Sequence, residues 1–175
     1  MNTVVWVILL AVAAGHHVTA AQEGGSAPEM SEDIRLMRER LVSLSRGEGS
    51  LAELRIQLMD GNRASHRSML LEGGELVIKK WTAPGSPMVE RKGIVTEARV
   101  SALLRQLIAK RYWTFHGTRF VIDAPTFLFR FYYPGLEHVA FYCDHEELDA
   151  SPARAEIREL FLDFVASTKT RPVEP

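Results

Sequence analysis

Eight consecutive residues in the second half of the chain constrain its fold more than any other segment. From Thr126 to Tyr133 the side chains alternate between two faces. One face carries Phe127, Phe129, Phe131 and Tyr133, and the other carries Thr126, Leu128, Arg130 and Tyr132. Since successive side chains of a strand point to opposite sides, the pattern predicts a β-strand with one aromatic face. Burying each phenylalanine stabilises a fold by roughly 1.5–3 kcal/mol, so we expect a second layer over that face.

Two segments have the apolar spacing of amphipathic helices that could form this layer. One begins after Thr96, an expected N-cap, and its stripe comprises Val100, Leu103, Leu104, Leu107, Ile108 and Tyr112. The other begins at Ser151-Pro152, a cap residue followed by proline at the first helical position. Its stripe comprises Ile157, Leu160, Phe161, Phe164 and Val165. We expect both helices to pack on the sheet that contains the aromatic strand.

A third helix is predicted earlier, after the expected N-cap Ser31. Its narrow apolar stripe comprises Ile34, Met37, Leu41 and Leu44, and Gly47 and Gly49 end it. We expect this helix to cover the sheet of its own chain. The alternative is a docking or dimer helix.

Further strands are predicted at residues 54–58, 67–71, 75–81, 88–95 and 136–143, and an Asp60-Gly61-Asn62 turn follows the first of them. Their connections are of hairpin length, which favours antiparallel pairing. The predicted fold class is therefore α+β, with an antiparallel sheet of about five or six strands and helices packed on one face. Residues 31–167 would form this single domain, between a flexible linker at 21–30 and a disordered tail at 168–175.

The amino-terminal residues 1–20 are typical of a signal peptide. The apolar run from Val4 to Ala14 is shorter than the roughly 20 residues of a membrane span. Val18-Thr19-Ala20 then offers small residues for cleavage after Ala20, with Ala21 as the alternative. We expect an exported protein, periplasmic or secreted, without a stable membrane anchor after cleavage. An uncleaved anchor or a buried amino-terminal strand is the alternative.

Composition limits the classes of partner. The formal net charge is -1, with 46% hydrophobic and 25% charged residues, which gives no global reason to expect nucleic acid or an anionic membrane. Seven basic residues against two acidic ones occur at residues 90–119, and eight acidic against two basic at residues 137–163. We expect the complementary solvated faces of two neighbouring helices. A basic patch for an anionic partner is the alternative.

The most reactive-looking stretch is Cys143-Asp144-His145-Glu146. Cys143 is the only cysteine, which excludes an intramolecular disulfide and a Cys-rich zinc site. Neighbouring side chains in a strand point apart, so we expect a polar turn with Cys143 buried beside it. The alternative is a metal site. The sequence contains no Gly-x-Ser-x-Gly, His-Glu-x-x-His or phosphate-loop motif. We therefore assign no catalytic residue, metal or cofactor.

The leading hypothesis is a non-enzymatic exported binding or accessory module of the cell envelope. Its partner would be another envelope or secreted protein, contacted through the surface helix or the strand faces of Tyr132 and Tyr142. Candidate binding residues are His138, Tyr142, Cys143 and His145. The competing hypothesis is a small hydrolase or metal-dependent enzyme that uses His138, Cys143, His145 and Asp123, with His116 as a further candidate base.

Three short motifs resemble those of bacterial exported domains of unknown function. They are Trp113 after a helix, the step Asp123-Ala124-Pro125-Thr126 into a strand, and the turn Gly135-Leu136-Glu137-His138. The resemblance covers residues 51–167 and implies early strands, a helix, a hairpin and a final helix. The cysteine motif that these domains carry near their first strand is absent here. The resemblance implies no activity and no site.

Overall fold

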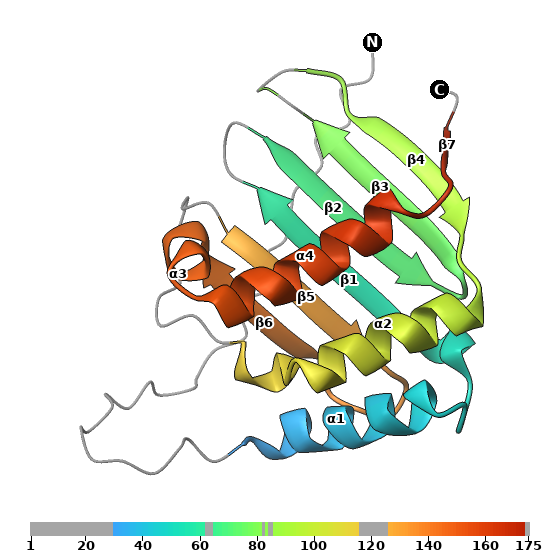
Figure 1. Ribbon diagram of the computed structural model, residues 1–175. Coiled ribbons are helices and arrows are strands. Elements are labelled where there is room, and N and C mark those ends of the chain that lie inside the picture. Colours follow the sequence, from blue (N-terminus) through green and yellow to red (C-terminus); the bar gives the residue numbers. More distant parts are fainter. Residues whose placement is uncertain (1–29, 62–64, 82, 84–85, 116–125, 174–175) are drawn as a thin grey trace.

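The computed structural model describes residues 30–61, 65–81, 83, 86–115 and 126–173 (Figure 1). The predicted signal peptide lies outside the described residues, as do nearly all of the predicted linker and the candidates His116 and Asp123.

The described strands form one antiparallel sheet, which confirms the predicted α+β class. Their order across the sheet is β6-β5-β1-β2-β3-β4-β7. The strands are β1 (Arg55–Gly61), β2 (His66–Glu72), β3 (Glu75–Trp81), β4 (Val89–Ile94), β5 (Thr126–Tyr132), β6 (Val139–Asp144) and β7 (Arg171–Pro172). The predicted aromatic strand is β5, and it lies between β1 and β6.

The helices lie on one side of the sheet, as predicted. They are α1 (Glu32–Ser45), α2 (Glu97–Ala109), α3 (His145–Asp149) and α4 (Pro152–Ala166), with short 3₁₀ turns η1 (Leu51–Glu53) and η2 (Tyr112–Thr114). Figure 1 shows α4 running diagonally across the sheet, with α2 beside it and α1 alongside α2. None of the helices in the described ranges combines the length and hydrophobicity needed to cross a bilayer.

Helix α1 buries its apolar stripe within its own domain. Met37, Leu41 and Leu44 are at most 1% exposed and α1 packs mainly against α2. The stripe is therefore occupied by the chain's own helix, which removes the apolar surface that the docking alternative required.

The aromatic face of β5 is the centre of the core. Phe127, Phe129 and Phe131 are fully buried. The ring of Phe129 lies 5.0 Å from that of Phe141 on β6 and 5.1 Å from that of Phe161 on α4, measured between centroids. The alternation in the sequence therefore predicted the buried face correctly, because the described helices pack on that side of β5.

The carboxyl-terminal tail differs from the prediction. Residues 168–173 are not free: Thr168 is 6% exposed, and β7 pairs with β4 as a seventh strand. Arg91 donates from Nε to Oγ1 of Thr170 and from Nη2 to its carbonyl oxygen, both at 2.9 Å. A Cβ on Gly93 would lie 2.6 Å from the carbonyl oxygen of Lys169, so only glycine allows this close approach.

The helices differ from the prediction in two places, at the end of α2 and at the short helix α3. Helix α2 ends at Ala109, before Tyr112, because Arg111 adopts a left-handed conformation with φ 54°. Residues 145–149, predicted as part of a polar turn, form α3, because Oδ1 of Asp144 accepts a hydrogen bond from the amide of Glu147 at 2.8 Å.

Candidate functional site

The four predicted binding residues do not form one site. His138 is exposed before β6, where its ring stacks on Tyr132 with centroids 5.5 Å apart. Tyr142 lies on the side of β6 away from the helices, whereas Cys143 is fully buried on the helical side. His145 begins α3 and contacts a different set of side chains. The competing enzyme set is therefore not assembled by its described members.

Cys143 is in an environment that suppresses thiol chemistry. Burial raises the pKa of its thiol to about 11, and nearby carboxylates add to the shift. Its sulfur lies 3.8 Å from Oε2 of Glu147 and 3.1 Å from the carbonyl oxygen of Asp144. The neutral thiol is a poor nucleophile and a poor metal ligand. Within the ranges that the structure describes, no three His, Cys, Asp or Glu side chains are grouped to hold a metal ion.

His145 belongs to a polar cluster centred on Asp60. Nε2 of His145 lies 3.0 Å from Oδ1 of Asp60, and Nη2 of Arg158 donates to its Oδ2 at 3.0 Å. The Asp60 side chain is 9% exposed, and those of His145 and Arg158 are each 29% exposed. Since a buried carboxylate requires compensating partners, these two bonds explain how Asp60 is tolerated beneath α3 and α4.

Sequence reasoning missed the Asp60 cluster because it assigned Asp60 and Gly61 to a turn. Both residues belong to β1, in which Asp60 follows Ile56 and Leu58 on the buried face. That two-residue spacing was the available signal for an inward carboxylate. A Cβ on Gly61 would lie 2.5 Å from the carbonyl oxygen of Ser65, so the approach of β1 and β2 requires glycine here.

The opposite side of the sheet has no helix over it among the described residues. We define the open face as eight outward side chains of β1, β5 and β6; Thr126 and Asp144, which pair at the end of β5 and β6, are not included. It comprises Arg55, Gln57, Met59, Leu128, Arg130, Tyr132, Ala140 and Tyr142. All of these are partly buried except Met59, which is exposed. The predicted strand faces of Tyr132 and Tyr142 thus lie on one continuous surface.

On this side of the sheet, the lysines of β3 and β4 form ion pairs, whereas the arginines of β1 and β5 do not pair with a carboxylate of the described residues. On β3 and β4, Lys79 lies 3.2 Å from Glu90 and Lys92 lies 3.3 Å from Glu75. On the open face, the guanidinium of Arg55 lies 5.2 Å from the Tyr132 ring centroid, and no carboxylate of the described residues pairs with Arg55 or Arg130. The Nε atoms of both arginines are buried and have no hydrogen-bond partner among those residues.

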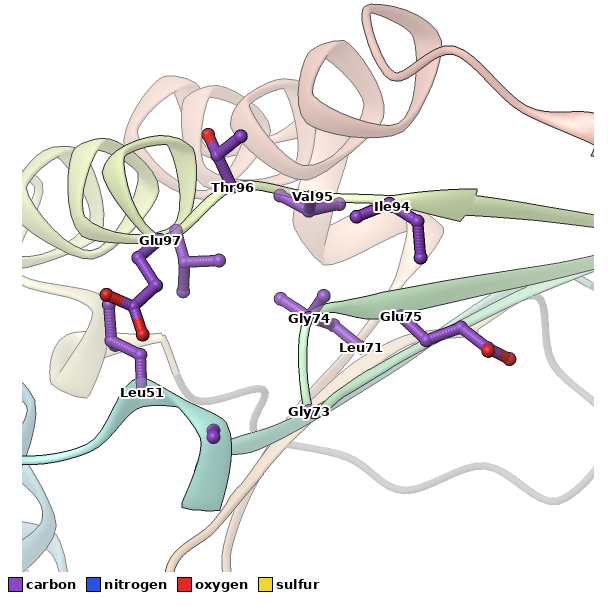
Figure 2. A pocket seen from close by; sticks show the side chains of 11 residues that line it. Leu51, Leu71, Gly73, Gly74, Glu75, Ile94, Val95, Thr96 and Glu97 are labelled. Atoms are coloured by element: carbon purple, nitrogen blue, oxygen red, sulfur yellow. The ribbon is translucent and has the colours of Figure 1, made fainter.

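A pocket of about 420 Å³ lies where the β2–β3 turn faces η1 and the start of α2 (Figure 2). Its glycine pair, Gly73 and Gly74, has φ +56° and +80°, as a two-residue hairpin turn of type I′ requires. Figure 2 shows the Glu97 side chain beside Leu51 and the Glu75 side chain directed away. Glu97 is in the first turn of α2, where it interacts favourably with the helix dipole, and Glu75 pairs with Lys92. Each charged group here has a structural explanation.

Comparison with known proteins does not identify a family. No protein-family model matches the chain, and no curated protein matches its sequence.

Proposed function

We propose that the chain is a non-enzymatic binding or accessory module of the cell envelope, exported by its amino-terminal segment. Its partner is another envelope or secreted protein, and the open face is the contact surface. The observation that carries the proposal is the pair of arginines on that face, Arg55 and Arg130, which have no carboxylate partner among the described residues.

The composition of the open face supports a protein partner. Tyrosine and arginine are enriched at protein interfaces and are frequent hot spots, and the open face carries two of each. Leu128 and Met59 are cross-strand neighbours on the same face, so the open face has apolar area beside its arginines.

Charge complementarity specifies the partner's chemistry. The direct cross-strand neighbours of Arg130 are Gln57 and Ala140, both uncharged. A partly buried guanidinium with a free Nε–H is suited to a carboxylate, which accepts two parallel hydrogen bonds from it. The proposed partner therefore presents an acidic segment to β5.

Site-specific photo-crosslinking in the native envelope fraction tests this surface. A photoreactive residue at Ala140, on the open face, should give one discrete adduct, and the same residue at the exposed Arg105 of α2 should not. Arg130→Gln should reduce the adduct, whereas Lys79→Gln, the same charge change on β3, should leave it intact. Equal adducts from both positions would contradict the proposal.

Mass spectrometry of the mature amino terminus tests the export part separately. A chain that begins at Ala21 or Gln22 is expected. Recovery of intact Met1 from cytosolic material would exclude export without affecting the surface argument.

The competing enzyme hypothesis gains no support from the described residues. His138 and Cys143 lie on opposite faces of the sheet, and the pKa of Cys143 is raised. Asp123 lies outside the described ranges.

A further inference from the structure

A second, smaller pocket lies at the end of the sheet where β1 finishes and β2 begins. It has a volume of about 190 Å³. Part of its wall is a row of three side chains from neighbouring strands. Asp60 on β1 is the cross-strand partner of Arg67 on β2, and Arg67 is the cross-strand partner of Lys80 on β3. His145 and Arg158 approach the same pocket from α3 and α4. Trp81 and His66, stacked with ring centroids 6.0 Å apart, line the remaining side.

The row contains an unfavourable arrangement of charge. Arg67 and Lys80 are directly opposite each other on neighbouring strands, where side chains begin about 5 Å apart and like charges destabilise the sheet. In the described part of the chain, no carboxylate forms an ion pair with either of them. Among the described residues, no contact of Arg67 or Lys80 explains why two cations lie side by side here.

Asp60 does not neutralise this pair. Its two oxygens are already engaged by His145 and Arg158, at 3.0 Å each. Counting Arg67, Lys80 and Arg158 against Asp60, with histidines neutral, the lining carries two more positive than negative charges. Glu159 lies 3.4 Å from Nη1 of Arg158, but it is 58% exposed and is not part of the lining.

Size and charge together restrict the ligand. Pockets that enclose whole organic ligands usually measure about 300–1,000 Å³, so this one suits a small group. Arg67 and Lys80, which pair with no carboxylate of the described residues, match a dianion, and a phosphate group carries a charge of about -1.5 to -2 near neutral pH. Arg67 offers five N–H donors and Lys80 three, enough to bind several oxygens of one group.

We infer that this pocket binds a phosphate group between Arg67, Lys80 and Arg158, with Asp60 holding Arg158 in position. The group is either inorganic phosphate or the phosphate of a small organic molecule. This site is separate from the open face and does not depend on the partner proposed there.

Titration of the purified mature protein with inorganic phosphate tests the inference, with amide and indole NMR shifts as the readout. Saturable shifts are expected at Arg67, Lys80 and the Trp81 indole, and chloride at equal ionic strength should not produce them. Lys80→Gln and Arg67→Gln should each weaken binding about tenfold, the effect of losing a charged hydrogen bond. Lys79→Gln is the matched control. Lys79 precedes Lys80 in β3, but its side chain lies on the opposite side of the sheet and pairs with Glu90.

The stability of the two variants separates a ligand-binding role of Arg67 and Lys80 from a purely structural one. If the two cations only stabilise the fold, each substitution should lower the melting temperature. If phosphate is their ligand, both variants should be at least as stable as the wild type without phosphate, because the like-charge contact is removed. Phosphate should raise the melting temperature of the wild type and of Lys79→Gln, and should raise that of the other two variants by less at the same concentration. Absence of saturable shifts, or equal affinity of Lys80→Gln and wild type, would overturn the inference.

Phenyl phosphate distinguishes the two sources of the group. If the phosphate belongs to an organic molecule with a ring, phenyl phosphate should bind more tightly than inorganic phosphate and shift the Trp81 indole further. Equal or weaker binding would exclude an aromatic phosphate ester and favour inorganic phosphate.

Discussion

Nη2 of Arg158 donates to Oδ2 of Asp60 at 3.0 Å, across 98 positions of sequence. Asp60 lies near the end of β1 and Arg158 in the first half of α4. Because His145 binds the other carboxylate oxygen, one aspartate connects β1 to both α3 and α4. Since this contact joins α4 to β1 at a buried position, its removal should lower the stability of the whole domain.

Asp60→Asn is expected to destabilise the protein by about 2–3 kcal/mol. Breaking a fully buried ion pair costs about 3–5 kcal/mol, and partial exposure of Arg158 reduces that loss. Chemical denaturation gives the free energy of unfolding. Glu159→Gln is the control, since Glu159 is an exposed partner of the same arginine and its loss should change stability by no more than about 0.5 kcal/mol. Equal losses of stability in both variants would show that the contact between Asp60 and Arg158 does not stabilise the fold more than an exposed ion pair does.

Tyr112→Phe is expected to stabilise the protein by about 1 kcal/mol. The Tyr112 side chain is fully buried, and its hydroxyl has no hydrogen-bond partner among the described residues. Burial also raises the pKa of this phenol, as expected for a hydroxyl that is desolvated without compensation. An unsatisfied buried hydroxyl costs about 1–3 kcal/mol, which the phenylalanine avoids.

Tyr133→Phe provides the matched comparison for Tyr112. The hydroxyl of Tyr133 donates to Oε2 of Glu53 at 2.6 Å, so its removal should lower the free energy of unfolding by about 0.5–1.5 kcal/mol. Thermal unfolding of the two variants should therefore shift in opposite directions. A destabilised Tyr112→Phe protein would mean that the hydroxyl is satisfied in solution.

His66 should make the protein less stable in mild acid. Burial lowers the pKa of His66 below its usual value of 6.5, and the Asp60 carboxylate only partly opposes the shift. As the pH falls below about 6.5, the unfolded chain therefore binds a proton before the folded one does, and stability decreases until the folded pKa is passed. His66→Gln should lose this component when urea unfolding is compared at about pH 7.5 and about pH 5.5. An unchanged pH dependence would contradict it.

Phe129→Ala should cost about 3–5 kcal/mol, the usual loss for a fully buried aromatic side chain. Phe129 contacts rings from β6 and α4 at once, so its removal leaves a cavity between the sheet and the helical layer. Leu128→Ala, at the adjacent position on the open face, should cost much less. Urea denaturation of the two variants measures this asymmetry, and equal losses would contradict one-sided coverage.

The sequence predicted those parts of the fold in which burial follows a repeating pattern. The alternation at Phe127, Phe129 and Phe131 identified the buried face of β5, and the stripe from Val100 to Leu107 identified the buried face of α2. Both patterns reflect one physical requirement, the exclusion of apolar side chains from water, so they can be recognised without knowing the partner element.

Features that depend on contacts distant in sequence could not be predicted in this way. Asp60 is tolerated at a buried strand position only because Arg158 and His145 reach it from α4 and α3. The tail is ordered only because Gly93 leaves room for the segment that precedes β7. The two-residue spacing of Ile56, Leu58 and Asp60 indicates an inward carboxylate but not its partners on α3 and α4, and the pairing of β7 with β4 leaves no periodic signal at all.

The proposed contact surface requires that the helices cover one side of the sheet and that the other side is accessible, and thiol labelling tests this directly. Ala140 and Cys143 lie on the same strand and face opposite sides. With a maleimide reagent, Ala140→Cys in a Cys143→Ala background should react rapidly in the native protein, whereas the wild-type Cys143 should react only after denaturation. Slow labelling at position 140, or rapid labelling of native Cys143, would contradict the arrangement on which the proposed function depends.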